Sequence, residues 1–563
     1  MGIFRQFPYS NFHDMNMDWI MEEIKKLQKQ CTYIINNDGS TAIVNVANYT
    51  PEGELTSDNI NDAVAEALNV SKYLFIPAGE YQCNLIFQQD VVLYLDRDCK
   101  FKTPDGNDPG VIDAYNCSIE IYGGEFTCGD DDGSKVPEWT GTYLAKHGVI
   151  RLYNCHDVNI KGLNFPHAKS GNCILLETCR DVIIENCQFH KYLECGVRLV
   201  YECRNVTVDS CIFTDIRYAI NRQYCYAVAT GAYDLGDVFI PPDNIVYSNN
   251  FVYDSEDCAL DTHGATNVTI RNNKIIDTVN AITAYNDDNR VTRPAGWVMS
   301  NVLIENNYCA TSKDIDPNSQ YPHQFVILGS YNEHASTEAG WSTNYGKYDN
   351  YSNCIFRNNY LKSPNTSPAG KILLGYIGRN YIIENNVIDC MGQGIIMSGR
   401  RLLNIQINNN TVLNRAGEII LWDSCGSIKN NTGVKFNYPT AHMSQITGMV
   451  GDYQTTRSFG LVKSGDMCRD GNDAMAVCSS YGTGVRPGLS VNSISVTVTN
   501  GIAVASSPVF CLVPNSAIAL GSINAYVVDM IDVLRFKVLT TAGAAVADGS
   551  YTLTYKTATL TAV

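Results

Sequence analysis

The sequence predicts an all-β fold whose central part, residues 92–432, is a right-handed parallel β-helix with three strands per coil. Three observations lead to this prediction. Cysteines return every 24 residues, a strand-like motif that mostly ends in asparagine returns with them, and the repeat is too short to hold a helix. A solenoid also explains how 563 residues can fold around one continuous core, because each repeat packs only against its neighbours.

The cysteine spacing indicates one small apolar side chain at the same place in each coil. Cys155, Cys179 and Cys203 are 24 residues apart, and so are Cys187 and Cys211. The 21 cysteines form neither a paired C-x-x-C metal pattern nor a short disulfide-stapled module. Free cysteine commonly behaves as a small buried hydrophobe. We therefore interpret these residues as core residues of a protein in a reducing compartment, rather than as metal ligands or redox centres.

A short alternation of apolar and polar residues recurs along the same region. Its copies begin at Asp157, Asp181, Asn205, Asn244, Asn267, Asn301, Asn353, Asn380 and Asn404. The alternation has the period of a β-strand, and the asparagines that follow it tolerate the left-handed backbone of a tight turn. Stacked turns should then form an asparagine ladder, with side-chain amides bonded to the coils above and below.

Five regions are predicted along the chain. Residues 1–37 form a helical segment with an apolar stripe, and residues 38–91 contain a capping helix near Ser57 and the first strands. The β-helix of residues 92–432 is followed by a linker, 433–490. Residues 491–563 are short strands separated by Gly, Asn and Pro, which predict a β-sandwich for trimerisation or glycan binding. The apolar stripe of the first region consists of Met17, Ile20, Met21, Ile24, Leu27 and Cys31.

Three segments resemble known families. The leader that begins at Phe7-Pro-Tyr resembles the N-terminal segments of appendage proteins in tailed bacteriophages, which dock a spike or fibre onto the virion. The capping helix, the following segment Tyr73-Leu-Phe-Ile-Pro-Ala-Gly-Glu-Tyr81 and the coils resemble the pectate-lyase-like superfamily, which includes phage tailspikes. The segment from Asp254 to Gly264 looks like the catalytic strand region of polygalacturonase-type hydrolases, although the adjacent Asp pair and the Gly-His-Gly of those enzymes are missing.

These resemblances imply a phage tailspike that binds and depolymerises a bacterial surface polysaccharide. Its expected partners are that glycan, other tail proteins through the N-terminal segment, and two further copies in a homotrimer. No cofactor is expected. Acidic residues outnumber basic ones by 58 to 41 and no basic run occurs, so nucleic-acid binding is not expected.

Location follows from what the sequence lacks. No stretch of about 18 apolar residues occurs, so membrane insertion is not expected. The start, from Met1, has no apolar core behind a basic end, so no signal peptide is expected. We expect synthesis in the host cytoplasm and a final place on the virion as a tail appendage.

Polar residues gather on the strand that precedes the asparagine motif in the central coils. Placing the apolar residues Val197, Ile220, Leu260 and Ile282 inward puts Arg198, Asn221, Asp261 and Thr283 outward on successive coils, about 4.8 Å apart. One exposed patch is therefore expected, made of Glu194, Arg198, Asp257, Asp261, His263 and Tyr285.

The predicted catalytic residues are Asp257 and Asp261, with Glu194 and His263 beside them. Two carboxyl groups can act as acid and base on a glycosidic bond, but four residues of straight strand span about 13 Å, so the chain must bend between them. Long insertions at 222–243, 286–300 and 311–352 are expected to border the substrate. The predicted substrate-binding residues are Arg198, Asn221, Arg222, Tyr285, Arg290, Arg293, Trp297 and Trp341, and no metal site is predicted.

Alternatives remain open at this point. A hydrolase is favoured over a lyase, which would need a base and a cation to neutralise an acidic sugar, a role open to Arg198, Arg222 or His263. A non-catalytic receptor-binding or structural appendage would use the same charges as surface ion pairs and the insertions as subunit contacts. A secreted pectinase-like enzyme fits poorly with the absent signal peptide and the docking helix.

Overall fold

The structure is a computed structural model. It describes residues 43–50, 54–104, 110–128, 148–168, 171–217, 225–231, 242–287, 299–312, 324–331, 351–364, 371–375, 378–390, 395–400, 402–413, 417–422, 425–437, 442–447, 467–470, 473–476, 485–507, 509, 512, 517–531 and 534–562. The helical segment expected over residues 1–37 lies outside these ranges.

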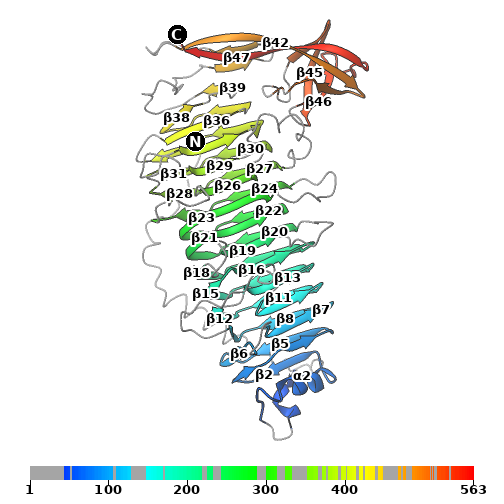
Figure 1. Ribbon diagram of the computed structural model, residues 1–563, viewed down its shortest axis with the longest axis vertical. Coiled ribbons are helices and arrows are strands. Elements are labelled where there is room, and N and C mark those ends of the chain that lie inside the picture. Colours follow the sequence, from blue (N-terminus) through cyan, green and yellow to red (C-terminus); the bar gives the residue numbers. More distant parts are fainter. Residues whose placement is uncertain are drawn as a thin grey trace, which may run out of the picture.

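Strands stack along one axis as a solenoid, with a small helical cap at one end and a β-barrel at the other (Figure 1). Two sheets of parallel strands form its walls. The first sheet contains β1 (Val44–Asn45), β2 (Tyr73–Ile76), β5 (Val91–Leu95), β8 (Ser118–Tyr122), β11 (His156–Lys161), β14 (Arg180–Glu185), β17 (Arg204–Asp209), β20 (Asp243–Ser248), β22 (Thr266–Arg271), β24 (Met299–Glu305), β27 (Tyr351–Arg357), β30 (Gly378–Glu384), β33 (Leu402–Leu403), β34 (Ile405–Asn408), β37 (Cys425–Lys429) and β39 (His442–Thr447). An antiparallel hairpin of β40 (Met467–Asp470) and β41 (Asp473–Ala476) extends it.

The second sheet has two strand positions per coil. It contains β3 (Gly79–Gln82), β4 (Leu85–Phe87), β6 (Cys99–Lys102), β7 (Ile112–Tyr115), β9 (Glu125–Cys128), β10 (Ile150–Tyr153), β12 (Asn164–Ala168), β13 (Asn172–Glu177), β15 (Gln188–Leu193), β16 (Cys195–Val200), β18 (Ile212–Arg217), β19 (Tyr226–Gly231), β21 (Phe251–His263), β23 (Lys274–Asp287), β25 (Tyr308–Ala310), β26 (Gln324–Tyr331), β28 (Tyr360–Ser363), β29 (Lys371–Gly375), β31 (Val387–Cys390), β32 (Ile395–Arg400), β35 (Thr411–Leu413), β36 (Gly417–Trp422) and β38 (Val434–Asn437).

One coil shows how the repeat is built. Strands β14, β15 and β16 follow one another, and the next coil pairs with them in parallel at Val182↔Val206, Phe189↔Phe213 and Val197↔Val228. In β21 and β23 the last two strand positions join into one long strand. The predicted β-helix with three strands per coil is confirmed.

Side chains of one kind stack inside the solenoid. Five phenylalanines form a continuous ladder with ring centroids 4.6 to 5.5 Å apart, namely Phe101, Phe126, Phe165, Phe189 and Phe213. The cysteines of the 24-residue repeat are free and fully buried, as predicted. Their thiols face main-chain oxygens, for example Cys179 Sγ at 3.2 Å from the carbonyl of Leu152. These cysteines are therefore core residues whose thiols also contact main-chain carbonyl groups.

Two asparagine ladders run along the turns of the first sheet. In the exposed ladder the amide of each residue donates to the preceding copy, as Asn301 Nδ2 does to Asn267 Oδ1 at 2.9 Å, and these residues have positive φ. In the buried ladder, Asn307 Nδ2 donates to the carbonyl of Ile270 and to Asn359 Oδ1, each at 3.0 Å. The predicted ladder is confirmed, and the second one begins where Cys187 and Cys211 give way to Asn250.

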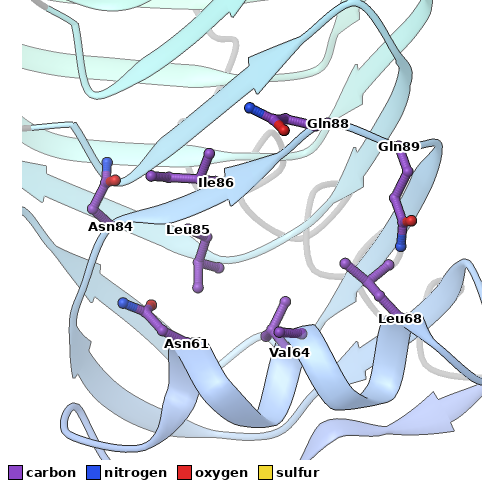
Figure 2. Close-up of a pocket in the computed structure, with 9 residues that line it drawn as sticks. Asn61, Val64, Leu68, Asn84, Leu85, Ile86, Gln88 and Gln89 are labelled. Carbon is purple, nitrogen blue, oxygen red and sulfur yellow. The ribbon is translucent and has the colours of Figure 1, made fainter.

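The cap consists of the 3-10 helix η2 (Val46–Tyr49) and helix α2 (Ile60–Leu68). Helix α2 begins three residues after Ser57, whose hydroxyl accepts a hydrogen bond from the backbone of Gln82 at 2.8 Å and so links the cap to β3. A cavity of about 650 Å³ lies between α2 and β4 (Figure 2). Aliphatic side chains such as Val64 and Leu85 and the carboxamides of Asn61, Asn84, Gln88 and Gln89 line it.

The C-terminal strands form a closed antiparallel barrel, in the order β42-β43-β46-β45-β44-β47. Its strands are β42 (Val485–Thr499), β43 (Ile502–Ala505), β44 (Ala517–Leu520), β45 (Ile523–Met530), β46 (Arg535–Thr540) and β47 (Gly549–Ala562). The C-terminal β domain is thus a single closed sheet rather than the two packed sheets of the expected sandwich, because β42 and β47 pair over their whole length and close it. Strand pairing of the solenoid continues through β38 and β39, which lie in the expected linker.

Among the described residues, no helix combines the length and the apolar character needed to cross a membrane.

Candidate functional site

The candidate site lies on the outer face of the second sheet, where β16, β19, β21 and β23 are neighbours. Arg198, Ala229, Asp261 and Thr283 are in register on these four strands, and Val197, Val228, Leu260 and Ile282 are buried in the core beside them. The predicted alignment is therefore correct for Arg198, Asp261 and Thr283. We call the outward side chains that are in register on these and the preceding coils the polar row. Its members are Asp113, Arg151, Leu175, Arg198, Ala229, Asp261 and Thr283.

The alignment of Asn221 with this row is wrong, and Ala229 occupies its expected place. The chain contains Tyr218-Ala-Ile and, eight residues later, Tyr226-Ala-Val. Both have the pattern of the strand, so spacing alone could not distinguish them, and β19 uses the second. Asn221 and Arg222 lie outside the described residues.

The chain bends between the two candidate carboxylates, as catalysis by the pair requires. Ala259 and Leu260, although consecutive, are both part of the interior core, whereas Cys258 belongs to a separate small cluster with Cys195 and Tyr226. A straight strand would place consecutive side chains on opposite faces. Two inward residues in succession therefore mark a corner, and Asp261 follows it on the outer face.

Asp261 is held on both carboxylate oxygens. The hydroxyl of Thr283 donates a hydrogen bond to Oδ1, and Nε2 of His263 lies 2.8 Å from Oδ2. The backbone N–H of His263 donates to the Thr230 hydroxyl at 2.7 Å, and the Tyr226 ring meets the imidazole edge-on at 6.3 Å between centroids. The side chain of Asp261 is only 1 % exposed, whereas that of His263 is 20 % exposed.

Asp257 is half-buried, and its carboxyl group has a raised pKa. Its pKa is raised from 3.8 to about 7, first by burial and then by the negative charge of Asp261. The backbone N–H of Cys225, the amide of Asn280 and the charge of His263 oppose this rise. Asn280 Nδ2 donates to Asp257 Oδ1 at 3.2 Å and fixes the side chain. Near neutral pH this carboxyl group can therefore release and regain a proton.

Glu194 and Arg198 form an ion pair at 3.6 Å. Their predicted exposure is corrected by the structure, as is that of Asp261: the side chains of Glu194 and Arg198 are 0 % and 14 % exposed. A side chain added at Gly231 would lie 2.8 Å from Arg198 Nη2, so this glycine leaves the space that the guanidinium group occupies. Buried charges of this kind need pairing because desolvation strongly disfavours them alone.

The structure does not describe the side chains of the other predicted binding residues. Tyr285 is in register with His263 on β23, but its side chain lies outside the described part. Arg290, Arg293, Trp297 and Trp341 lie outside the described residues. The third insertion contains strand β26, which continues the solenoid wall next to β23.

A second buried ion pair lies on the polar row, at residues that were not predicted as site residues. Arg151 contacts Asp113 through Nε and Nη2 at 2.5 Å each, and Asn84 Nδ2 donates to the same carboxylate at 3.0 Å. The available signal was the repeated tetrapeptide, Gly-Val-Ile-Asp ending at Asp113 and Gly-Val-Ile-Arg ending at Arg151. The strand register places Arg151 three coils before Ala229 and Asp113 four coils before it.

Other chemistries have little support in this part of the protein. Burial raises the pKa of the Cys195 thiol to about 12, so it is not a nucleophile at neutral pH. Among the described residues, no group of three His, Cys, Asp or Glu side chains could hold a metal ion. The cavity at the cap lies about 29 Å away along the axis, six coil spacings from Asp257, and is not part of this site.

The family model described as the right-handed β-helix region matches residues 82–234 and, overlapping them, 148–313. No curated protein matches the chain. Similar solved structures include a tailspike of Pseudomonas phage phi297, with 11 % identity, coverage of 89 % of this chain and 92 % of that one, and a TM-score of 0.45. A mutant tailspike of E. coli bacteriophage HK620 in complex with a pentasaccharide has 12 % identity, coverage of 96 % and 100 %, and a TM-score of 0.46. An exopolygalacturonase of Thermotoga maritima has 12 % identity, coverage of 75 % and 96 %, and a TM-score of 0.37. Similarity at this level transfers neither residues nor activities to this chain.

Proposed function

We propose that this right-handed β-helix protein is a phage tailspike that binds a bacterial surface polysaccharide along the polar row and hydrolyses its glycosidic bonds. The observation that carries the proposal is Asp257, a half-buried carboxyl group with a pKa of about 7 next to Asp261. General acids that act near neutral pH need such a pKa, and paired carboxyl groups in different environments are the usual means of glycoside hydrolysis.

Asp257 is the general acid in this proposal. Its proton passes to the glycosidic oxygen while the bond from that oxygen to the anomeric carbon breaks. A water molecule adds to the anomeric carbon, and its proton passes to the pair formed by Asp261 and His263. One new reducing end and one new hydroxyl group result. Asn280 and Thr283 position the two carboxyl groups through the hydrogen bonds they donate.

Arg198, whose side chain is 14 % exposed, gives the row a cationic group that could bind an extended polar chain. Arg198 lies two coil spacings, about 10 Å, from Asp261 along the axis. A polymer that follows the axis would therefore pass the guanidinium group within about two sugar units of the reacting bond. In this proposal the N-terminal segment binds other tail proteins, and the protein is located on the virion.

The test is to incubate the purified protein with a panel of bacterial capsule, O-antigen and cell-wall glycans. New reducing ends without new double-bond absorbance would support hydrolysis, whereas double-bond absorbance would support a lyase. Asp257→Asn should lower cleavage about a hundredfold or more while binding is kept. The exposed Asp58→Asn is the matched control and should cleave like the parent. Binding without cleavage in the parent would establish the second candidate, a non-catalytic receptor-binding appendage, for which the buried and paired state of Glu194 and Asp261 is the favouring observation.

A further inference from the structure

The cavity at the cap lies at the end of the face that carries the polar row. Ile86 on β4 is in register with Asp113 on β7, so it occupies the place of the polar row one coil before Asp113. Ile86 lines the cavity and is 61 % exposed. Asn84, which also lines it, donates from Nδ2 to Asp113 Oδ2 at 3.0 Å and to the carbonyl oxygen of Gly110 at 2.9 Å. A polymer that follows the polar row toward the cap therefore arrives at this cavity.

One face of helix α2 forms the opposite wall of the cavity. Its lining residues are Asn61, Val64, Ala65 and Leu68, which are three or four residues apart and so share one side of the helix. Figure 2 shows Val64 on α2 and Leu85 on β4 pointing toward one another. Both of these side chains are buried and form an aliphatic floor, whereas Asn61 and Ala65 are exposed. The cavity is therefore open to a ligand from solvent.

The polar side chains of the cavity are all carboxamides. Asn61, Asn84, Gln88 and Gln89 supply them, and none of the described residues that line the cavity is charged. A carboxamide has an oxygen that accepts hydrogen bonds and an NH₂ group that donates them, so it can meet a hydroxyl group in either role. The NH₂ group of Asn84 already donates twice within the protein, so its oxygen is the atom that it offers to a ligand.

These properties fit an uncharged sugar. Sugar hydroxyl groups donate and accept hydrogen bonds, as carboxamides do, and the C–H groups of a sugar ring can pack against the aliphatic floor. The volume of about 650 Å³ lies within the range of about 300 to 1,000 Å³ that is usual for small-ligand pockets. An acidic sugar fits less well, because its carboxylate would lose water without gaining a cation.

We propose that the cavity at the cap is a second carbohydrate-binding site, selective for uncharged sugars, which holds one part of the polysaccharide while another part lies at Asp257. The inference rests on the proposed function for the identity of the polymer. The two sites are six coil spacings, about 29 Å, apart along the axis. Two linked sites bind one chain more tightly than either does alone, because the second contact is intramolecular. The cavity thereby keeps the polymer on the protein after each cleavage.

The experiment fills the cavity from its exposed side. Ala65→Trp places a large side chain in the cavity, and Glu66→Trp, at the next exposed position of α2 but outside the lining, is the matched control. Both changes are made in the Asp257→Asn background, which keeps the glycan intact. Affinity is measured for immobilised uncharged and acidic polysaccharides of bacterial capsules, O-antigens and cell walls. Ala65→Trp should weaken the binding of an uncharged polysaccharide about a hundredfold, the lower end of the gain from two linked sites, and Glu66→Trp should leave it unchanged.

Gln88→Ala, at an exposed position of the lining, tests the same site even if Ala65→Trp fails to fold. It should weaken the same binding about fivefold, as expected for the loss of one hydrogen bond. Equal affinity of the cavity variants and the control for every polysaccharide that is bound would overturn the proposal, and so would a loss confined to acidic polysaccharides. Cleavage by the parent protein would in either case still support the proposed function. If the parent neither binds nor cleaves any of these polysaccharides, the proposed function and this inference both fall.

Discussion

Replacing Asp257 by asparagine should have two opposite effects, a loss of glycan cleavage and a gain of stability at alkaline pH. The asparagine side chain would keep the shape of the aspartate and a carbonyl oxygen that accepts the hydrogen bond from Asn280. It would remove the negative charge that burial and Asp261 disfavour. The proton needed for the leaving oxygen would be lost with it, so activity and stability should change in opposite directions.

The size of the stability change follows from the pKa. A carboxyl group whose pKa rises on folding binds more protons in the folded protein, so stability falls as the pH rises from the unfolded pKa to the folded pKa. For Asp257 this window runs from about 4 to about 7. Three pKa units correspond to about 4 kcal/mol, which is the upper limit of the cost at pH 8. The variant should be more stable by up to this amount at pH 8 and by almost nothing near pH 4.

Unfolding midpoints of the parent, Asp257→Asn and the exposed control Asp58→Asn, measured in urea from pH 4 to pH 8, provide the assay. The difference between the Asp257 variant and the parent should grow with pH and level off above pH 7, while the control follows the parent throughout. A variant that is less stable than the parent at pH 8, or a difference that does not change with pH, would show that the pKa of Asp257 does not rise on folding.

Three further predictions concern the solenoid itself. Denatured protein should react with a thiol reagent at many more cysteines than native protein, since the fifteen cysteines from Cys83 to Cys354 whose side chains the structure describes are free and buried. Asn307→Ala should lower the free energy of unfolding by about 3 kcal/mol or more, because it leaves buried donors of Asn273 without an acceptor. Asn301→Gly, in the exposed ladder at a φ of 59°, should lower the free energy of unfolding much less. Gly196→Ala should cost about 1 to 3 kcal/mol in denaturant unfolding, because the added carbon would lie 2.7 Å from the Phe213 ring.

The repeat was predictable because a solenoid repeats its local rules in every coil. Cys155, Cys179 and Cys203 identify the coil length, and the asparagines after each strand identify the turns, where Asn272, Asn306 and Asn358 have positive φ. The site was less predictable. Two similar tripeptides, Tyr218-Ala-Ile and Tyr226-Ala-Val, compete for one strand, and only the spatial path of the chain decides between them. The closed barrel depends on pairing between β42 and β47, which are distant in sequence.

Facing outward and being exposed are different properties in this protein, and the difference bears on function. Asp113, Arg151 and Asp261 all belong to the polar row, yet each is at most 7 % exposed. Strand periodicity predicts only the direction in which a side chain points, whereas its burial also depends on what covers that face. Burial is the reason that these charges occur in pairs and that the pKa of Asp257 is raised.

Leu175 shows that folding does not require charge on the polar row. It stands in register between Arg151 and Arg198, and it is fully buried. An aliphatic side chain is therefore accepted there, and replacing buried ion pairs by well-packed apolar residues is often neutral or stabilising. The coils on either side nevertheless carry Asp113 with Arg151 and Glu194 with Arg198. Under the proposed function, an extended polar chain lying along the row would reach the partly exposed Arg198 and the half-buried Asp257 rather than the buried partners of these pairs.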